Sequence, residues 1–253
     1  MKTAFIITST INVDNQYPLT YSPVRSYFSA EERLRQTQFT INSIAQATKE
    51  EDTTIYLLDS SPNWGEYLQQ LIYQKNLRFI SVAFDWPEVY EITKSHANKT
   101  RCESLIMSSF LNKHAKELEK FDYVFKMSGR YFINSSFDIN IIENNPDKIF
   151  YKKYLEHEWQ DYWGYDMVDR RAFQNDNKLR QYCSVLFGWG KKYQKSFADL
   201  YTAMAAITDR PSMQHYDIET LGYFLTRPWE QDIIETDWIV NGWHGPDGKF
   251  VRY

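Results

Sequence analysis

Charged and polar residues alternate with apolar ones at the end of the segment 121–131. If this segment is extended, its period of two places Lys126, Ser128 and Arg130 on one side and the apolar residues on the other. Two positive charges then flank Gly129, where a ligand can approach the backbone, and an arginine can bind phosphate oxygens with two parallel hydrogen bonds. The pattern predicts a diphosphate site. The alternative, a surface strand with solvated charges, is less favoured because Lys126 interrupts an otherwise apolar run.

A second basic cluster opens a helix that we predict over residues 98–120. Asn98, Lys99 and Arg101 fall in its first turn, where free backbone N–H groups and the helix dipole attract phosphate. Basic residues are unfavourable in a first turn unless an anion is present, so this cluster favours the same kind of ligand. A solvated turn in which Glu103 offsets the charge remains equally open.

The first half of the chain supplies the elements that must position these groups. Apolar runs predict strands, and the amphipathic stretches between them predict helices. The predicted strands are 4–7, 54–58, 78–84 and 123–127. One helix is predicted to begin after residue 29, and two more to cover 64–75 and 98–120. Ser29 and Glu32 form the capping box of the first helix. This alternation implies right-handed crossovers and a mostly parallel sheet covered by helices on both faces.

Ligands of such sheets bind outside the carboxyl ends of the strands. The predicted strand ends carry polar residues, namely Thr8, Ser9, Thr10, Asp59, Asp85 and Ser128 to Arg130. A strand end is also polar simply because the chain leaves the core there. The clustering therefore indicates where a site would lie without proving one.

The second half is less periodic. We expect a strand over 184–190 and helices over about 192–207 and 216–226. Aromatic residues between 151 and 189 stand among charges, which is typical of a sugar-stacking surface or an oligomer interface. No Pro/Gly/Ser-rich linker separates the halves, so we expect one domain.

Bulk composition excludes several classes of protein. The 253 residues are 43% hydrophobic, 17% aromatic and 25% charged, which argues against disorder, and no apolar run approaches a membrane span. A net charge of −4 does not suit a nucleic-acid binder. Cys102 and Cys183 show neither metal-ligand spacing nor the spacing of a disulfide framework. The five histidines likewise show no metal-ligand spacing. We expect a cytoplasmic protein and leave peripheral membrane association and homo-oligomerisation open.

Several of these segments together resemble bacterial and viral glycosyltransferase-like proteins of the GT-A type, best over residues 1–140. They are Glu32-Arg33-Leu34, Leu57-Leu58-Asp59-Ser60-Ser61, Asn98-Lys99 and Phe125-Lys126-Met127-Ser128-Gly129-Arg130-Tyr131. The resemblance implies a single α/β GT-A-like domain, with a nucleotide-binding half (1–135) and an acceptor-side half (136–253). It implies a nucleotide-sugar donor lying over Thr8, Ser9, Thr10 and Asp59, near the basic residues described above, and a glycan or lipid-linked acceptor.

One departure from the family pattern concerns metal. GT-A enzymes typically carry an Asp-x-Asp motif after the fourth strand, where this chain has Ser128-Gly129-Arg130. We therefore expect metal-independent transfer, with Lys126 and Arg130 stabilising the leaving diphosphate. A metal held by Asp217 or His244 stays open.

The segment 214–221 looks like the acidic motif that supplies the general base of inverting GT-A enzymes. Glu219 matches the base position and Asp217 is then the helix N-cap, although the reverse assignment is open. We expect Trp189 and His244 on the acceptor side.

Two other functions remain. One is a non-catalytic nucleotide- or glycan-binding protein with a decayed transferase fold. The other is a nucleotidyltransferase, which the missing Gly-rich phosphate loop disfavours. The sequence leaves the donor, the acceptor and the stereochemical outcome undetermined.

Overall fold

The computed structural model describes residues 1–253 except 64–68, 70, 72–75, 159–177, 215 and 246. The strands are β1 (Thr3–Ser9), β2 (Thr53–Asp59), β3 (Leu77–Ser81), β4 (Tyr123–Ser128), β5 (Tyr131–Ile133), β6 (Ile149–Lys152), β7 (Leu155–Glu158), β8 (Lys178–Gln181), β9 (Leu186–Gly190), β10 (Ile233–Thr236), β11 (Val240–Trp243) and β12 (Phe250–Arg252). The α-helices are α1 (Ala30–Ala47), α3 (Val82–Asp85), α4 (Pro87–Thr93), α5 (Lys99–Lys113), α6 (Ala115–Leu118), α7 (Ile139–Glu143), α8 (Gln194–Thr208) and α9 (Ile218–Thr226).

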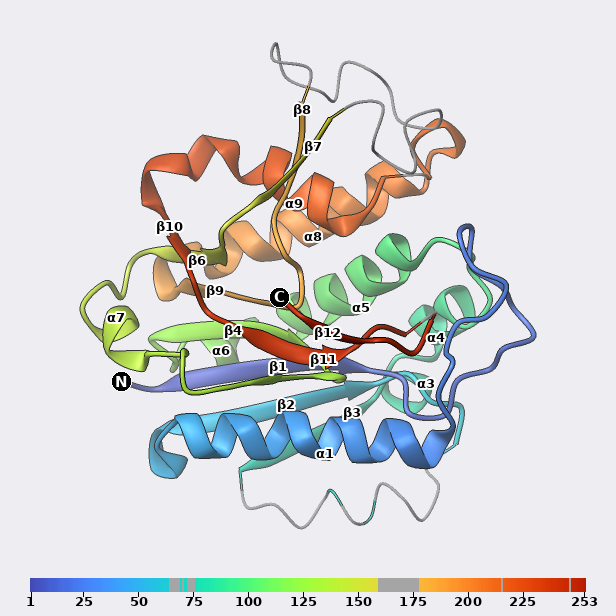
Figure 1. Cartoon of the computed structure of the whole chain (residues 1–253), viewed down its shortest axis with the longest axis horizontal. Helices are drawn as coiled ribbons and strands as arrows, with labels where there is room; N and C mark the ends of the chain where they lie inside the picture. Colours follow the sequence, from blue (N-terminus) through green and yellow to red (C-terminus); the bar gives the residue numbers. More distant parts are fainter. Residues whose placement is uncertain (64–68, 70, 72–75, 159–177, 215, 246) are drawn as a thin grey trace.

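Seven strands form a central sheet in the order β10-β6-β9-β4-β1-β2-β3, in which β9 alone runs antiparallel to its neighbours (Figure 1). The chain builds outward from β1 to β3 and then returns to place β4 on the other side of β1. Three strands from the second half, β6, β9 and β10, continue the same sheet. The prediction of a mostly parallel α/β sheet flanked by helices is confirmed.

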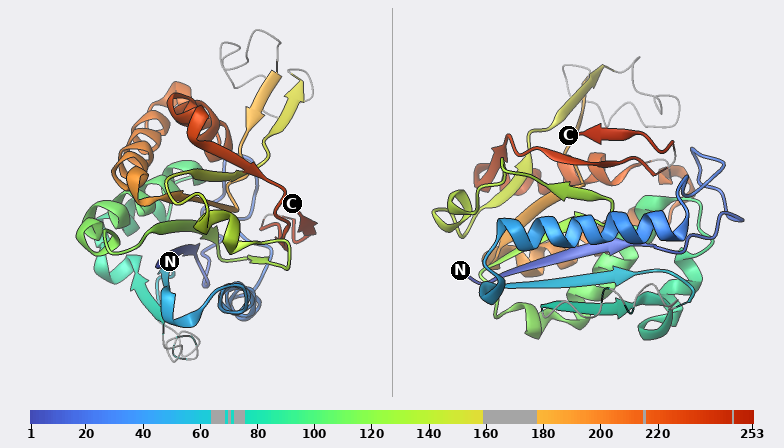
Figure 2. Two further views of the ribbon diagram at one scale, coloured as in Figure 1. Left: turned by 90° about the vertical axis from the view of Figure 1, so that its left-hand side faces the viewer. Right: turned by 60° about the horizontal axis from the view of Figure 1, so that its bottom comes forward.

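Alternation along β1 explains why the sheet is covered on both faces (Figure 2). Ala4 and Ile6 point into the core under α5, α8 and α9, whereas Phe5 and Ile7 point into the core under α1 and α7. All four side chains are fully buried. The continuous apolar run therefore belongs to a strand with two buried faces, as predicted.

Helix α1 begins with the predicted capping box, in which the Ser29 hydroxyl and the Glu32 carboxylate cap each other's backbone. Its buried side also carries two threonines that hold the chain after β4. The Thr37 hydroxyl donates to the Gly129 carbonyl at 3.1 Å, and the Thr40 hydroxyl donates to the Tyr131 carbonyl at 2.6 Å. This segment is thus fixed by the helix that covers it.

A three-stranded antiparallel sheet, in the order β12-β11-β5, lies beside α1. Its inner residues complete the α1-side core, with Tyr131, Ile133 and Val240 all buried. The turn between β11 and β12 reaches the carboxyl end of β4, because the Trp243 amide donates to the Arg130 carbonyl at 3.2 Å.

Element boundaries differ substantially from the prediction at two places. The third strand ends at Ser81, since Val82–Asp85 turn into α3 and the Asp85 carboxylate accepts from the Ser81 amide at 2.9 Å. The helix expected over 98–120 is split at His114 into α5 and α6. The helix expected over 64–75 lies almost entirely outside the described residues. None of the described helices has both the length and the apolar character needed to cross a bilayer.

Two glycines give a matched test of the packing. An alanine Cβ at Gly190 would collide with the Pro146 carbonyl oxygen, whereas at Gly222, inside α9, the nearest atom is Met204 Cε at 3.9 Å. We expect Gly190→Ala to lower the free energy of unfolding by about 1–3 kcal/mol or more and Gly222→Ala to raise it by up to about 1 kcal/mol. Urea denaturation measures both, and equal effects of the two changes would contradict the packing at β9.

Candidate active site

A cleft of about 1050 Å³, counted out to its open mouth, lies at the carboxyl ends of β1 and β4. This is where the strand order reverses, the usual ligand position in an open α/β sheet. The structure brings seven of the predicted donor-site residues to its lining: Thr8, Ser9, Thr10, Lys99, Ser128, Gly129 and Arg130. The cleft thus lies where the sequence predicted a ligand site, and the binding of a donor there stays a prediction.

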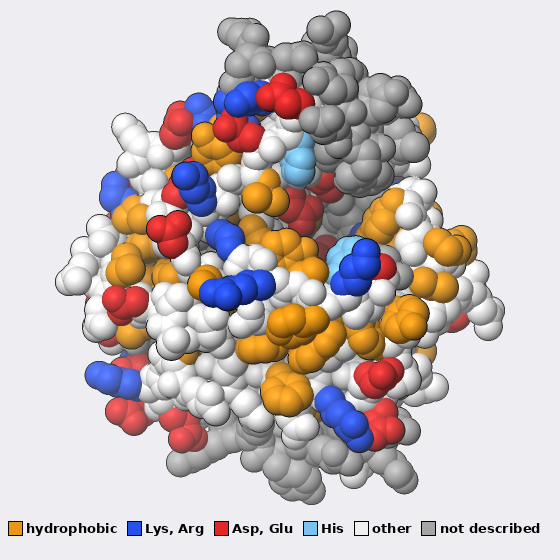
Figure 3. Space-filling model, viewed as in Figure 1, with side chains coloured by type: hydrophobic (Ala, Val, Ile, Leu, Met, Phe, Trp, Pro, Cys, Tyr) orange, Lys and Arg blue, Asp and Glu red, His pale blue; other side chains and the backbone are white. Residues whose placement is uncertain are grey.

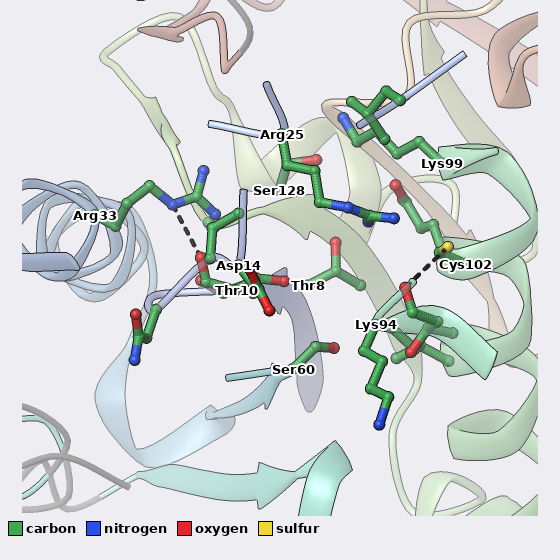
Figure 4. Close-up of a pocket in the computed structure, with 18 of the residues that line it drawn as sticks. Thr8, Thr10, Asp14, Arg25, Arg33, Ser60, Lys94, Lys99, Cys102 and Ser128 are labelled. Carbon is green, nitrogen blue, oxygen red and sulfur yellow. Dashed lines mark hydrogen bonds between the residues drawn. The ribbon is translucent and has the colours of Figure 1, made fainter. Parts of the chain in front are cut away.

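The lining is rich in positive charge. It contains five basic residues, Arg25, Arg33, Lys94, Lys99 and Arg130, and two acidic ones, Asp14 and Glu103. Figure 4 shows Arg33 entering from α1 on one side and Lys94 and Lys99 from the opposite side, around the strand-end residues Thr8, Ser60 and Ser128. A chain of net charge −4 thus concentrates cations at the place where a ligand would bind.

Two of the basic side chains of the cleft, Arg33 and Lys99, have lowered pKa values. Burial and the nearby guanidinium of Arg130 lower the pKa of Arg33 to about 9, against a weaker opposing effect of Asp59. Desolvation and Arg130 likewise lower the pKa of Lys99 to about 8, although much of the lysine side chain is exposed. A bound polyanion would relieve this repulsion. The electrostatics therefore favour a ligand with several negative charges.

Arg130 is held by its backbone neighbours, while its guanidinium pairs with no carboxylate among the described residues. The Gly129 amide donates to the Thr8 carbonyl at 2.9 Å, and a Cβ at Gly129 would lie 3.0 Å from Ser9 Cβ. Gly245 packs directly against the guanidinium. The glycine at 129 thus allows β1 and the β4 end to approach closely, and Arg130 is left to face the cleft.

Lys126 does not contact the cleft, contrary to the prediction that it clamps the diphosphate. Its side chain is fully buried on the α5 side of β4, where it forms an ion pair with Glu103. Its ammonium also donates to the Ser184 carbonyl at 2.9 Å and to the Ser128 hydroxyl at 3.2 Å. Lys126 lies on the predicted side of the strand, but its ammonium contacts protein groups beneath the cleft.

Three more predicted donor-site residues have structural roles instead. The buried Asp59 carboxylate accepts from the amides of Ile11 and Ser61, at 3.0 and 2.9 Å. Asn98 caps α5 by accepting from the Arg101 amide at 2.8 Å, and Arg101 pairs with Asp209. None of the three lines the cleft. Their polar groups hold the loops from which the lining residues project.

Asp217 takes the N-cap position that the sequence favoured for it, whereas the role of Glu219 as a general base stays a prediction. Asp217 is the N-cap of α9, accepting from the Thr220 amide at 2.6 Å, and it also accepts from the Gln181 amide group at 2.6 Å. Glu219 instead accepts from the Ser184 hydroxyl. Its charge is close enough to the cleft to act on the pKa of Lys99 and of Tyr21.

Burial, and to a lesser extent the neighbouring charge of Asp217, raise the pKa of Glu219 to about 7, against the lowering effects of the Ser184 hydrogen bond and the Lys99 charge. A carboxylate with a pKa near neutrality suits a general base, because it is available in its ionised form and binds a proton strongly. The arrangement can therefore accept a proton beside a cation-rich cleft.

The residues predicted to lie on the acceptor side are Trp189 and His244, together with the aromatic residues that follow residue 150. Trp189 is fully buried and stacks on Phe197 at 4.1 Å between ring centroids, so the prediction that it forms an acceptor surface is wrong. His244 lies on the turn after β11 and pairs with Asp247 at 2.7 Å. Tyr151 is also buried, and the aromatics Trp159, Tyr162, Trp163 and Tyr165 lie outside the described residues.

Sequence reasoning missed the site role of Arg33, Arg25 and Ser184. Arg33 carried a readable signal, since it lies on the same buried side of α1 as Thr37, Thr40 and Ile44. An arginine at a buried helix position needs a partner or a ligand. Here it donates to the Thr10 carbonyl at 3.0 Å at the edge of the cleft. Arg25 and Ser184 come from loops and gave no periodic signal.

The residues after β4 do not fit a divalent cation, since Ser128, Gly129 and Arg130 present a guanidinium where a metal needs carboxylates. Within the described ranges, no three His, Cys, Asp or Glu side chains are grouped as metal ligands. Asp217 and His244, the alternative metal ligands, are engaged in the contacts described above. Metal-independent chemistry stays a prediction.

The sequence matches no protein-family profile and no curated protein. The structure is similar to the apo form of mouse xyloside xylosyltransferase 1, with 8% sequence identity and a TM-score of 0.48, over 94% of this chain and 86% of that chain. At this distance the similarity says nothing about activity or substrate.

The raised pKa of Glu219 predicts a pH-dependent gain in stability for Glu219→Gln. The folded chain keeps this proton up to about pH 7, while an unperturbed carboxyl loses it near 4.5, so the wild type loses stability as pH rises between these values. Glutamine removes the penalty. We expect a gain of about 1–3 kcal/mol in the free energy of unfolding at pH 8 and little gain at pH 4.5.

Urea denaturation at both pH values measures the difference. Glu31→Gln, at an exposed position of α1, is the control and should change stability by less than about 0.5 kcal/mol at either pH. A difference for Glu219→Gln that does not vary with pH would contradict the assignment.

Proposed function

We propose that the protein is a glycosyltransferase that moves a sugar from a nucleotide-sugar donor to a hydroxyl group of a glycan or lipid-linked acceptor. The observation that carries the proposal is the crowding of Arg33, Lys99 and Arg130 at the carboxyl ends of β1 and β4, with Glu219 nearby. The three basic side chains suit a leaving diphosphate, and the Glu219 carboxylate suits proton removal. The resemblance of the 125–131 segment to GT-A glycosyltransferases supports the same function.

In the proposed reaction, Glu219 accepts the proton of the acceptor hydroxyl as its oxygen bonds to the anomeric carbon. The bond from that carbon to the diphosphate oxygen breaks, and the nucleoside diphosphate leaves with the bonding electrons. Arg130, Arg33 and Lys99 stabilise the charge that develops on this oxygen and its phosphates. A single displacement of this kind inverts the anomeric configuration.

Lys126 acts indirectly in this scheme. It fixes the Ser184 carbonyl and the Ser128 hydroxyl, while the Ser184 hydroxyl orients Glu219. One buried ammonium therefore supports both the diphosphate side and the base side of the cleft. We class Lys126 and Ser184 as positioning residues, because neither lines the cleft.

A screen with UDP-, GDP-, CMP- and dTDP-sugars, read by thermal shift and by turnover, tests the proposal. With the active donor, Arg130→Ala should lower turnover about 10²–10³-fold through lost stabilisation of the leaving group, and Glu219→Gln should lower it about 10²–10⁴-fold while donor binding persists. Lys195→Ala is the control, because Lys195 is exposed on α8 and pairs with Asp199 outside the cleft.

Three outcomes would count against this function. Unchanged turnover in Arg130→Ala and Glu219→Gln would refute the mechanism. Binding of a nucleotide sugar without turnover under any condition would favour a decayed, binding-only fold. An equal loss in Lys195→Ala would show that the effect is not specific to the cleft.

Removal of divalent cations tests the electrostatic role of the arginines. If Arg130 and its neighbours replace a metal, excess EDTA should leave turnover within about twofold of the untreated value, because no step depends on a bound cation. The measurement is the initial rate with and without EDTA, followed by readdition of Mg²⁺ or Mn²⁺. Loss of activity that either metal restores would disprove metal independence.

A further inference from the structure

Four aromatic side chains meet on the outer surface formed by the three-stranded sheet and α1: Phe39, Phe132, Trp243 and Phe250, called here the aromatic face. Ring centroids are 6.4 Å apart for Phe39 and Phe132, 5.8 Å for Phe132 and Trp243, and 5.5 Å for Trp243 and Phe250. Phe39 and Phe250 are 57% and 58% exposed. Figure 3 shows hydrophobic side chains gathered at the centre of this side of the molecule.

Strand register explains why these rings face outward. Trp243 pairs with Phe250, and Asn241 pairs with both Phe132 and Arg252, so these side chains share one face of the sheet. The alternate residues fill the core on the other face. An antiparallel sheet with one buried face normally carries polar residues on the other. A group of exposed rings in this place marks an interaction surface.

The aromatic face adjoins the cleft. The Trp243 amide donates to the carbonyl of Arg130, and Gly245, two residues further on, packs against the Arg130 guanidinium. The Tyr27 amide donates to the Gly245 carbonyl at 2.9 Å, which ties the same turn to the loop before α1. A partner seated on the aromatic face would therefore lie next to the cleft.

Basic side chains surround the rings. Arg252 shares the outer face of β12 with Phe250, Lys249 precedes it with 76% side-chain exposure, and Arg35 lies one helical turn before Phe39 with 68%. Glu31 and Asp247 partly offset Arg35 and Lys249. Arg252 has no carboxylate partner in the part of the chain that the structure describes. Its charge is available to an anionic partner.

The shape of the aromatic face decides between occupants. Neighbouring rings are tilted by 40° to 75° relative to one another, so together they form no continuous flat surface along which an extended glycan could lie. A symmetric contact with a second copy would place the same cationic rim on both sides of the interface, against like charge. Aromatic rings flanked by long basic side chains instead match the headgroup region of an anionic bilayer.

We propose that the aromatic face docks the protein on an anionic membrane surface, with the cleft beside the bilayer. Docking in this orientation would present the donor to an acceptor hydroxyl carried on a lipid. The proposed membrane contact does not depend on the proposed transferase activity. The choice of a lipid-linked acceptor over a free glycan does rest on that proposed function.

Flotation with vesicles of phosphatidylcholine and phosphatidylglycerol tests the docking without donor or acceptor. We expect the 253-residue chain to float with these vesicles and to float less with vesicles of phosphatidylcholine alone. The double variant Phe39→Gln, Phe250→Ser should lower the bound-to-free ratio about tenfold or more, because two exposed rings no longer insert. Phe84→Ser, at a 67% exposed aromatic on α3, is the matched control and should bind as the wild type does.

Arg252→Glu provides an independent arm that leaves every ring in place, and it should also reduce binding to anionic vesicles. Absence of flotation for the wild type, or equal flotation for the double variant, would overturn the proposal. Equal binding to neutral vesicles would overturn the role of the basic rim. A dimer that light scattering detects and the double variant dissociates, with no vesicle binding, would assign the aromatic face to a second copy. Failure of sugar transfer would leave all these results unaffected.

Discussion

The buried ion pair between Lys126 and Glu103 is the contact on which the site depends. Lys126 has no exposed surface, and a charge taken out of water is costly unless an opposite charge and hydrogen bonds compensate it. Glu103 supplies the charge, while the Ser184 carbonyl and Ser128 hydroxyl supply the hydrogen bonds. These partners come from α5, from the segment before β9 and from β4 itself. Packing of the three elements must therefore satisfy one ammonium group.

The geometry of the cleft follows from that requirement. With α5 drawn against β4, the first turn of α5 places Lys99 at the cleft, and the end of β4 places Arg130 there. With the 184 backbone held by Lys126, the Ser184 hydroxyl reaches Glu219 at the start of α9. Cations and the candidate base are thus positioned by the same buried charge, although this charge does not itself face the ligand.

Local patterns predicted the parts of this arrangement that depend on neighbours along the chain. The period of two placed Lys126 and Ser128 on one side of β4, and the capping patterns located the starts of α1 and α9. What local patterns could not predict is which element packs over each side. The prediction that Lys126 binds the diphosphate is wrong because α5 packs over this side of β4 and Glu103 pairs with the lysine. Trp189 failed because β9 lies inside the sheet, between β4 and β6, where a ring among charged neighbours in sequence is still buried.

The remaining charges of the cleft oppose folding in the absence of a ligand. Arg33 is held near Arg130 at the cost of a depressed pKa, and Glu219 is held in surroundings that disfavour its ionised form. A protein selected for stability alone would remove or pair these groups. An anion among the arginines and an acceptor hydroxyl at Glu219 would compensate both. Under the proposed function, the substrates would complete this unfavourable part of the electrostatics, which would account for the uncompensated cations at the reversal point of the sheet.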